Sequence, residues 1–388
     1  MNKPLLQSIL VITFLFISKI TFAQGVDSEF ENFKEFFTLY PNKKEATQDS
    51  TLYKSKLILA PIISFAPETS LGIGVGAKHL FKFKGSGDET RTSNMPMTLQ
   101  YTLKNQFIVY SGFEVFTNQE KWVIEGNFRF ENFPRLFFGL GRDSVDSKEE
   151  IYGSYQLLFE PIFLKQMFLK HLFIGGGIRY NHIFNTEFEE NGLLKKISPI
   201  GFEGSTSAGV EFAMLYDSRD NILNARHGLY LEFTHGFYGK ALGGKQEFQL
   251  TRFDLRYFLQ PFKNLDDVIG FNILGKASHK DVPFSELALF GGNEILRGYI
   301  EGRYVDRNII AGQIEYRKNL KGRLGMVAFI GGGDVASRME NFNIGNIRPN
   351  FGAGLRFLLD KEERLNVRLD WGFGEDTNNV YLNIAESF

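Results

Sequence analysis

The chain has 388 residues, a formal net charge of −1 at pH 7 and no cysteine, and its composition includes 41 Phe and 40 Gly. Balanced acids and bases argue against a nucleic-acid partner, and the missing cysteines exclude disulfides, Cys-ligated metals and thiol nucleophiles. Abundant Phe and Gly without long apolar runs after residue 23 are typical of membrane strands, in which one face contacts lipid and the other stays wet.

Residues 1–23 have the organisation of a secretory signal peptide. Residues 5–16 are largely apolar, and Thr21-Phe22-Ala23 places small residues at the two positions that a signal peptidase reads. A transmembrane helix is the alternative, but the apolar run is too short for one and Lys19 interrupts it. We therefore expect cleavage before Gln24 and export of the rest.

Residues 24–56 form a short acidic and polar segment, which we expect on the periplasmic side. Four phenylalanines in it have roughly helical spacing, namely Phe30, Phe33, Phe36 and Phe37. One interpretation is an amphipathic helix at the periplasmic mouth of the following domain, and the other is a disordered lead-in.

Residues 57–388 are predicted to form one transmembrane antiparallel β-barrel. Apolar and polar residues alternate with period two in about sixteen segments, each long enough to cross a membrane as a tilted strand. The expected strands are 57–65, 71–84, 94–104, 107–117, 122–131, 150–163, 171–183, 205–216, 228–238, 247–260, 267–279, 308–318, 323–334, 350–360, 364–374 and 378–388.

The alternation is clearest in residues 122–131. Its aromatic face carries Trp122, Ile124, Phe128 and Phe130, and its polar face carries Val123, Glu125, Asn127, Arg129 and Glu131. A soluble sandwich would also alternate. Charges in the middle of a strand, however, fit a watery lumen better than a solid core. In residues 247–260, Phe248 and Leu250 are out of phase with the apolar residues that follow, which predicts a bulge or an extramembrane start.

The connections predict the orientation of the barrel. With both termini in the periplasm, short polar turns at 118–121, 263–267, 318–322 and 360–363 fall on one side. Long connections at 132–149, 184–204, 280–307 and 335–349 fall on the other, as expected for external loops. The last strand ends in a phenylalanine, and its alternate residues are typical of a C-terminal assembly signal: Val380, Leu382, Ile384 and Phe388.

Three stretches resemble the BamA/TamA superfamily of outer-membrane assembly and translocation barrels, also called the bacterial surface antigen type. The first is Phe290-Gly291-Gly292 followed by the loop motif Leu296, Arg297, Gly298 and Tyr299. The second is a periplasmic turn with Asp217, Arg219, Asp220 and Gly228, and the third is residues 365–388. The resemblance implies that the long loop 280–307 folds back into the lumen.

Arg297 is the candidate functional residue of that loop. A guanidinium on a tucked loop can pair bidentately with a carboxylate of the wall, whereas the alternative is a solvated loop arginine. The family places an aspartate on the thirteenth strand, where this chain has Gly331–Gly333, so the expected partners are Glu315, Asp334 and Asp370. The carboxylates and arginine of the 217–228 turn are expected to be structural.

The resemblance implies a non-enzymatic barrel for protein insertion or translocation at the outer membrane, through a seam between residues 57–65 and 379–388. Because residues 24–56 are too short for a POTRA module, we expect a barrel-only member. The alternative is a passive pore without client handling. The six His lie in no nucleophile motif and no metal-ligand spacing, so no catalytic residue, metal or cofactor is predicted. Expected partners are outer-membrane lipid, the barrel assembly machinery for its own insertion, and client proteins or a larger complex.

Overall fold

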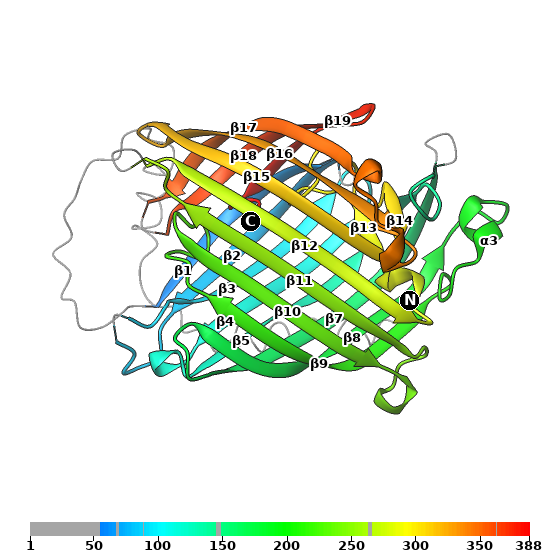
Figure 1. Cartoon of the computed structure of the whole chain (residues 1–388), viewed down its shortest axis with the longest axis horizontal. Coiled ribbons are helices and arrows are strands. Elements are labelled where there is room, and N and C mark those ends of the chain that lie inside the picture. The colour runs from blue at the N-terminus through cyan, green and yellow to red at the C-terminus, as the bar shows by residue number, and fades with distance from the viewer. Residues whose placement is uncertain (1–54, 67–69, 88, 145–148, 263–265, 362) are drawn as a thin grey trace. The chain divides into compact units, whose positions relative to one another are not determined.

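The computed structural model describes residues 55–388 except 67–69, 88, 145–148, 263–265 and 362. The expected signal peptide and the segment 24–54 therefore lie outside the described residues. Sixteen long antiparallel strands form a closed barrel, which confirms the predicted fold class (Figure 1). The wall strands are β1 (Lys56–Ala66), β2 (Ser70–Phe81), β3 (Ser93–Thr102), β4 (Phe107–Phe116), β5 (Trp122–Asn132), β7 (Glu150–Gln166), β8 (Leu172–Glu187), β9 (Ser205–Asp217), β10 (Gly228–Tyr238), β11 (Phe248–Leu259), β12 (Val268–Lys280), β15 (Asn308–Lys321), β16 (Leu324–Ala336), β17 (Arg348–Asp360), β18 (Leu365–Gly374) and β19 (Thr377–Ile384).

Short elements occupy the connections. They are the strands β6 (Arg135–Phe137), β13 (Ala288–Phe290) and β14 (Tyr304–Asp306), the helix α3 (Leu193–Ile197), and single 3-10 turns at Asn118–Glu120, Lys240–Leu242, Phe284–Glu286, Met339–Asn341 and Ile344–Asn346. No helix in the described part of the chain is long and apolar enough to cross a membrane.

Period-two alternation determines which side chains face outward. In β5, Trp122 is 43% exposed on the outer face, whereas Val123 and Glu131 are buried on the inner face. The other wall strands likewise expose large apolar side chains on the outside, among them Leu59, Ile73, Leu99, Phe163, Ile330 and Trp371. Such an outer surface suits lipid and not water.

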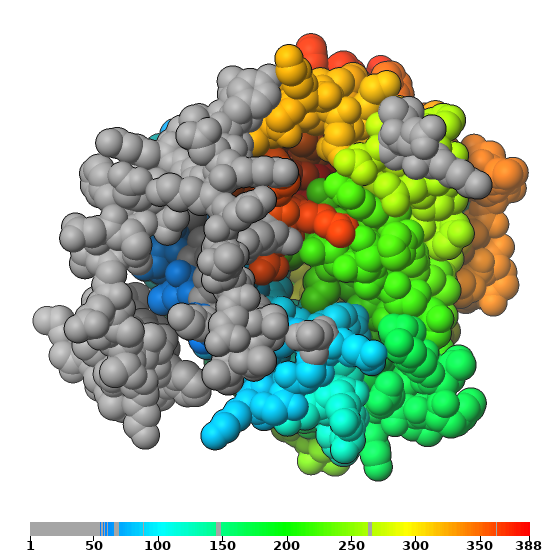
Figure 2. Space-filling view, turned by 90° about the vertical axis from the view of Figure 1, so that its left-hand side faces the viewer, coloured from blue at the N-terminus to red at the C-terminus, as the bar shows by residue number. Residues whose placement is uncertain are grey.

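The two ends of the barrel differ in their connections. The turns after β4, β15 and β17 are short, as predicted, and the end that carries them is called the short-turn end. The opposite, long-loop end carries the connection 281–307 between β12 and β15, together with α3, β13 and β14 (Figure 1). Figure 2 looks into the short-turn end, where orange-to-red atoms of the C-terminal region lie inside the ring of strands.

The connection 281–307 fills the lumen at the long-loop end. Val282, Phe284 and Leu287 pack with Phe137, Leu194, Tyr238, Phe248 and Leu250 in one apolar cluster. A second cluster joins Phe290, Leu296, Tyr299 and Tyr304 to the inward residues Ile309, Ala311 and Val335. Of the two alternatives predicted for this strand, the bulge before Phe253 is wrong. The β10–β11 register is continuous, and Phe248 and Leu250 are apolar on the inner face because they cover the loop.

The last strand is shorter than predicted. Pairing of β19 with β18 ends at Ile384, and Ala385 takes a left-handed φ of 75°. The residues after it turn into the lumen, so Phe388 is 9% exposed and packs with Ala225, Phe258 and Val268. By strand parity Phe388 would have faced outward with Ile384. Residues 386–388 are called the tail below.

The barrel closes between β1 and β19, and among the residues that the structure describes this overlap is short. Phe65 opposite Leu382 is the one registered pair between these strands among the described residues. In comparison, the β15–β16 ladder runs from Asn308 opposite Ala336 to Lys321 opposite Leu324. The β1–β19 junction is called the seam.

Candidate functional site

The loop motif Leu296–Tyr299 lies inside the lumen against β15 to β19. Leu296 has φ 60° and Gly298 has φ 115°, so the chain makes a tight turn here. A Cβ atom on Gly298 would come within 2.6 Å of the carbonyl carbon of Phe373. Glycine is therefore required at position 298 both by its conformation and by the close approach of the wall.

Arg297 is fully buried and pairs with two carboxylates of the wall. Its Nη1 donates to Asp370 Oδ2 at 2.5 Å and its Nη2 donates to Glu315. The guanidinium carbon also lies 3.6 Å from the ring centroid of Phe329. The pairing and the stacking suit the flat, delocalised cation of arginine and not the ammonium of lysine. Arg297, Glu315 and Asp370 are called the latch.

Asp334, the third expected partner, does not contact Arg297. It forms an ion pair at 3.1 Å with Arg142, which belongs to the connection after β5. The prediction for Asp334 is therefore wrong. The connection between β5 and β7 thus reaches the long-loop end of the barrel, where its Arg142 pairs with the Asp334 carboxylate.

Three further arginines extend the latch along the inner wall. Arg317 donates to Glu315 Oε1 at 2.8 Å. Arg356 and Arg368 donate to Asp370 at 2.5 Å and 2.9 Å. Because every one of these side chains is nearly or fully buried, removal of one charge would leave its partners without compensation in a poorly solvated place.

The same arginines hold the tail. Arg356 Nε donates to Glu386 Oε2 at 2.7 Å, and Arg317 donates to the main-chain oxygen of Phe388 at 2.9 Å. Phe388 stacks on Phe258, with ring centroids 5.8 Å apart. The lumen loop and the tail are therefore bound to one continuous group of charges.

The loop motif also contacts the seam strand directly. The Tyr381 hydroxyl accepts from the Gly298 N–H at 3.0 Å and donates to the Tyr299 carbonyl at 3.1 Å. Thr377 and Asn379 both donate to the Gly298 carbonyl. Since these three side chains come from β19, the loop motif fixes the inner face of that strand.

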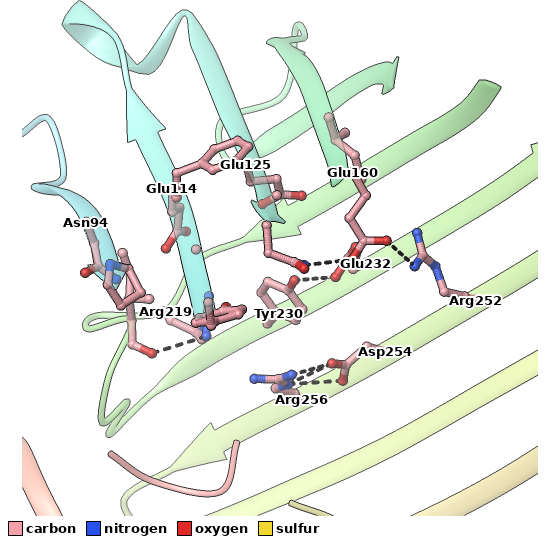
Figure 3. A pocket seen from close by; sticks show the side chains of 18 of the residues that line it. Asn94, Glu114, Glu125, Glu160, Arg219, Tyr230, Glu232, Arg252, Asp254 and Arg256 are labelled. Atoms are coloured by element: carbon pink, nitrogen blue, oxygen red, sulfur yellow. Dashed lines mark hydrogen bonds and ion pairs between the residues drawn. The ribbon is translucent and has the colours of Figure 1, made fainter. Parts of the chain in front are cut away.

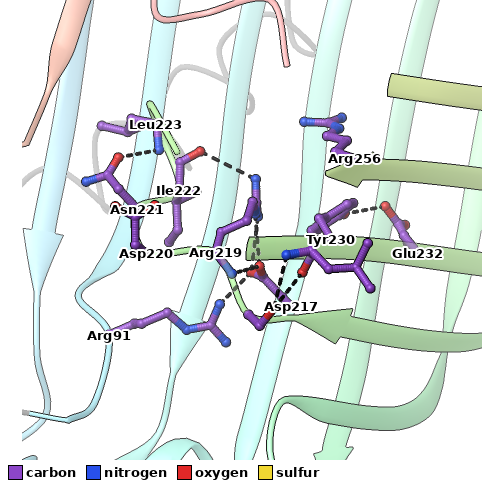
Figure 4. A network of polar contacts seen from close by, with 12 residues as sticks. Arg91, Asp217, Arg219, Asp220, Asn221, Ile222, Leu223, Tyr230, Glu232 and Arg256 are labelled. Carbon is purple, nitrogen blue, oxygen red and sulfur yellow. Dashed lines mark hydrogen bonds and ion pairs between the residues drawn. The ribbon is translucent and has the colours of Figure 1, made fainter. Parts of the chain in front are cut away.

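The turn motif forms a separate network at the short-turn end (Figure 4). Asp217 is 1% exposed and accepts from Arg219 at 2.9 Å and from Arg91 at 2.5 Å. Asp220 accepts from the backbone N–H groups of Arg226 and His227 and pairs with Arg364.

Gly228, the last residue of the turn motif, has φ 115°, and a Cβ on it would lie 2.4 Å from the Ser218 carbonyl oxygen. Burial alone would raise the pKa of Asp220, but Arg364 and the two N–H donors of the turn hold that pKa below its usual value. This network stabilises the β9–β10 connection.

Comparison with known families identifies the chain. A family model described as the Omp85 superfamily domain matches residues 174–388, more than half of the chain. The chain belongs to the Omp85 superfamily. This confirms the resemblance inferred from the loop and turn motifs. Omp85 barrels are outer-membrane proteins that insert or secrete other proteins.

Two solved structures share the fold of this Omp85 barrel. BamA from Haemophilus ducreyi lacking POTRA domains 1–3 is 11% identical with a TM-score of 0.55, and the match covers 86% of this chain and 70% of that one. CdiB from Acinetobacter baumannii has the same identity and TM-score, with 87% and 66% covered. At this identity the likeness shows the fold alone. No curated protein matches the sequence.

A polar cavity of about 520 Å³ lies in the lumen of this Omp85 barrel, in the half nearer the short turns (Figure 3). Its lining includes the carboxylates Glu114, Glu125 and Glu232 and three arginines, of which Arg256 pairs with Asp254 at 2.5 Å. The charges that the sequence carries in mid-strand thus line a cavity. In the described part of the chain no group of His, Asp and Glu could hold a metal ion.

Two residues of the site were not singled out from the sequence. Arg356 links the latch to the tail, and Tyr381 links the loop motif to the seam strand. Both residues lie at inward positions of an alternating strand, between apolar outward neighbours. This alternation was the one feature of the sequence that could have placed them in the lumen. Their partners were not predictable because the loop and the tail are distant in sequence.

Proposed function

We propose that this protein is a non-enzymatic, integral barrel of a Gram-negative type outer membrane that inserts or translocates other proteins through its seam. The observation that carries the proposal is that β1 and β19 share one registered pair among the described residues, Phe65 opposite Leu382. An unpaired strand edge offers backbone donors and acceptors to which a client strand can add.

The inward tail accounts for the short overlap at the seam. If the register of Phe65 and Leu382 continued, residues 385–388 would lie opposite residues 59–62 of β1. The left-handed turn at Ala385 removes them from that edge. Pro61 lies in the same stretch of β1 and has no N–H to donate to a neighbour. Both features leave the seam edge of β1 free for another strand.

The closed long-loop end supports client handling over a passive pore. Two apolar clusters that include residues of the loop fill the lumen there. The latch holds the loop against the wall of the barrel. A pore for small solutes needs an open path through the barrel. In this proposal the partners are outer-membrane lipid around the apolar outer face, the assembly machinery that inserts the barrel itself, and client proteins at the seam.

A disulfide across the seam tests the proposal. Directly opposite strand residues have Cα atoms close enough for a disulfide, so Phe65→Cys with Leu382→Cys would lock β1 to β19. The native chain has no cysteine to interfere. The matched control is Ile314→Cys with Ile330→Cys, an opposed pair on the outer face of the fully paired β15–β16 ladder.

The readout is the outer-membrane proteome of cells that depend on each variant. Under oxidising conditions the seam variant should show the same loss of client proteins as a gene deletion, and reductant should restore them. The control pair should behave as the native chain in both conditions. Normal client levels with the seam fully cross-linked would contradict insertion through the seam. A steady open conductance of the native protein would favour a passive pore.

A further inference from the structure

A second cavity, of about 570 Å³, opens at the short-turn end, and eight of its twenty lining residues are cationic. Six of them come from the turns and the adjoining strand ends: Arg226, Lys318, Lys321, Arg323, Lys361 and Arg364. We call this cavity the basic cup. Figure 2 shows the end at which it lies, with yellow-orange atoms of the β15–β16 region at the rim.

The inner part of the cup is formed by the group of charges that holds the tail. Arg317, Arg356 and Glu386 all line it. Glu386 and Asp266 are its only acidic lining residues in the described part of the chain, against eight cationic ones. The cup therefore carries a strong excess of positive charge over its own carboxylates.

Several of the cations lack a full complement of partners. Arg226 has a loose pair with Asp266 at 3.3 Å, and Arg323 donates to backbone carbonyls. Lys318 and Lys361 are exposed, and neither has a carboxylate partner among the described residues. These groups can accept an anionic ligand without losing a strong interaction.

One donor in the cup is both buried and unused. Arg356 is only 5% exposed, yet its Nη2 has no hydrogen-bond partner among the described residues, while Nε and Nη1 hold Glu386 and Asp370. A buried guanidinium nitrogen without an acceptor is costly. It marks the inner part of the cup as a place for a ligand oxygen.

We infer that the basic cup binds an acidic polypeptide segment, which presents its carboxylates from the short-turn side. Carboxylates pair with guanidinium groups through short, charge-assisted hydrogen bonds, and the volume is within the range of ligand sites. Arg317 and Arg356 lie on the inner face of the wall, which a peptide can reach and a lipid of the surrounding bilayer cannot. The inference does not depend on opening of the seam.

Fluorescence anisotropy of a fluorescein-labelled hexaglutamate peptide, titrated with the full protein in a nonionic detergent, tests the inference. The variant Lys318→Glu/Lys361→Glu should bind about tenfold more weakly. The matched control is Lys121→Glu/Lys170→Glu, which makes the same charge change at two exposed lysines of other turns at the same end. It should bind as the native protein does. Heat-modifiable gel migration shows that both variants are folded.

Each other outcome would overturn the inference. Equal weakening in the two variants would mean that the peptide senses net charge and not the cup. Equal binding of a labelled hexaglutamine peptide would mean that carboxylates are not recognised. Unlabelled glycerophosphoglycerol and unlabelled hexaglutamate can each be used to displace the labelled peptide. If both displaced it at the same concentration, the cup would be assigned to an anionic lipid headgroup. Binding that persists in about 0.5 M salt would exclude an electrostatic site.

Discussion

At the scale of single residues, Arg297 has the largest structural role in the lumen loop. It is fully buried, and it links the loop to carboxylates on two strands, β15 and β18. A buried ion pair adds little net stability compared with an apolar pair, but its disruption is expensive because a charge is left uncompensated. The latch therefore specifies the position of the loop more than it stabilises the barrel.

The substitution Arg297→Ala should lower the free energy of unfolding by about 3 kcal/mol, since Glu315 and Asp370 lose a shared partner in a buried site. Urea unfolding in detergent micelles, followed by tryptophan fluorescence, measures the change. Arg338→Ala, at an exposed loop arginine, is the control and should change it by less than about 0.5 kcal/mol. Equal effects of the two substitutions would show that the latch has no special role.

The partners of Arg297 illustrate what the sequence can predict at this scale. Strand parity placed Glu315 and Asp370 on the inner face, where the structure has them. Asp334 lies opposite the outward Ile310 and next to the inward Val335, so strand parity places it on the other face and argues against it as a partner. Arg142, from another connection, takes Asp334 and leaves the other two to Arg297.

At the scale of elements, local periodicity predicted the strands but not the positions of the tail and of the lumen loop. Alternation is a property of neighbouring residues, so all sixteen wall strands were predictable. The tail was predicted as strand because its residues continue the pattern. Its actual direction depends on Arg317 and Arg356, which belong to β15 and β17. Likewise Phe248 and Leu250 are apolar at inward positions, out of phase with the rest of β11, because the loop 281–307 packs against them in the lumen.

The loop 281–307 is the element whose removal should change the barrel most. Replacement of residues 283–303 by a short glycine linker should convert a small conductance into a steady open pore, because the loop supplies most of the second lumen cluster and part of the first. Single-channel recording in a planar bilayer measures this. As a control, shortening of the exposed connection 337–347, where Ile344 is 87% exposed, should leave the conductance unchanged. An unchanged conductance after the 283–303 replacement would show that other segments close the lumen.

At the scale of the whole molecule, the barrel is sealed unevenly around its circumference. Fifteen of the sixteen junctions have extended ladders, and the remaining one is the seam. In a membrane, a backbone group without a partner costs several kcal/mol. The tail, the loop motif and the seam strand share one group of side chains, so the seam and the lumen loop form a single structural unit. A client strand that pairs with β1 would complete the wall.

Amide hydrogen exchange of the protein in nanodiscs tests the seam most directly, because exchange reports whether a backbone N–H is held in a stable ladder. Peptides that cover β1 and β19 should exchange much faster than peptides that cover β15 and β16, which have the extended ladder. In the Phe65→Cys/Leu382→Cys disulfide variant that difference should shrink. Equal, strong protection of all four strands in the native protein would contradict a weakly paired seam.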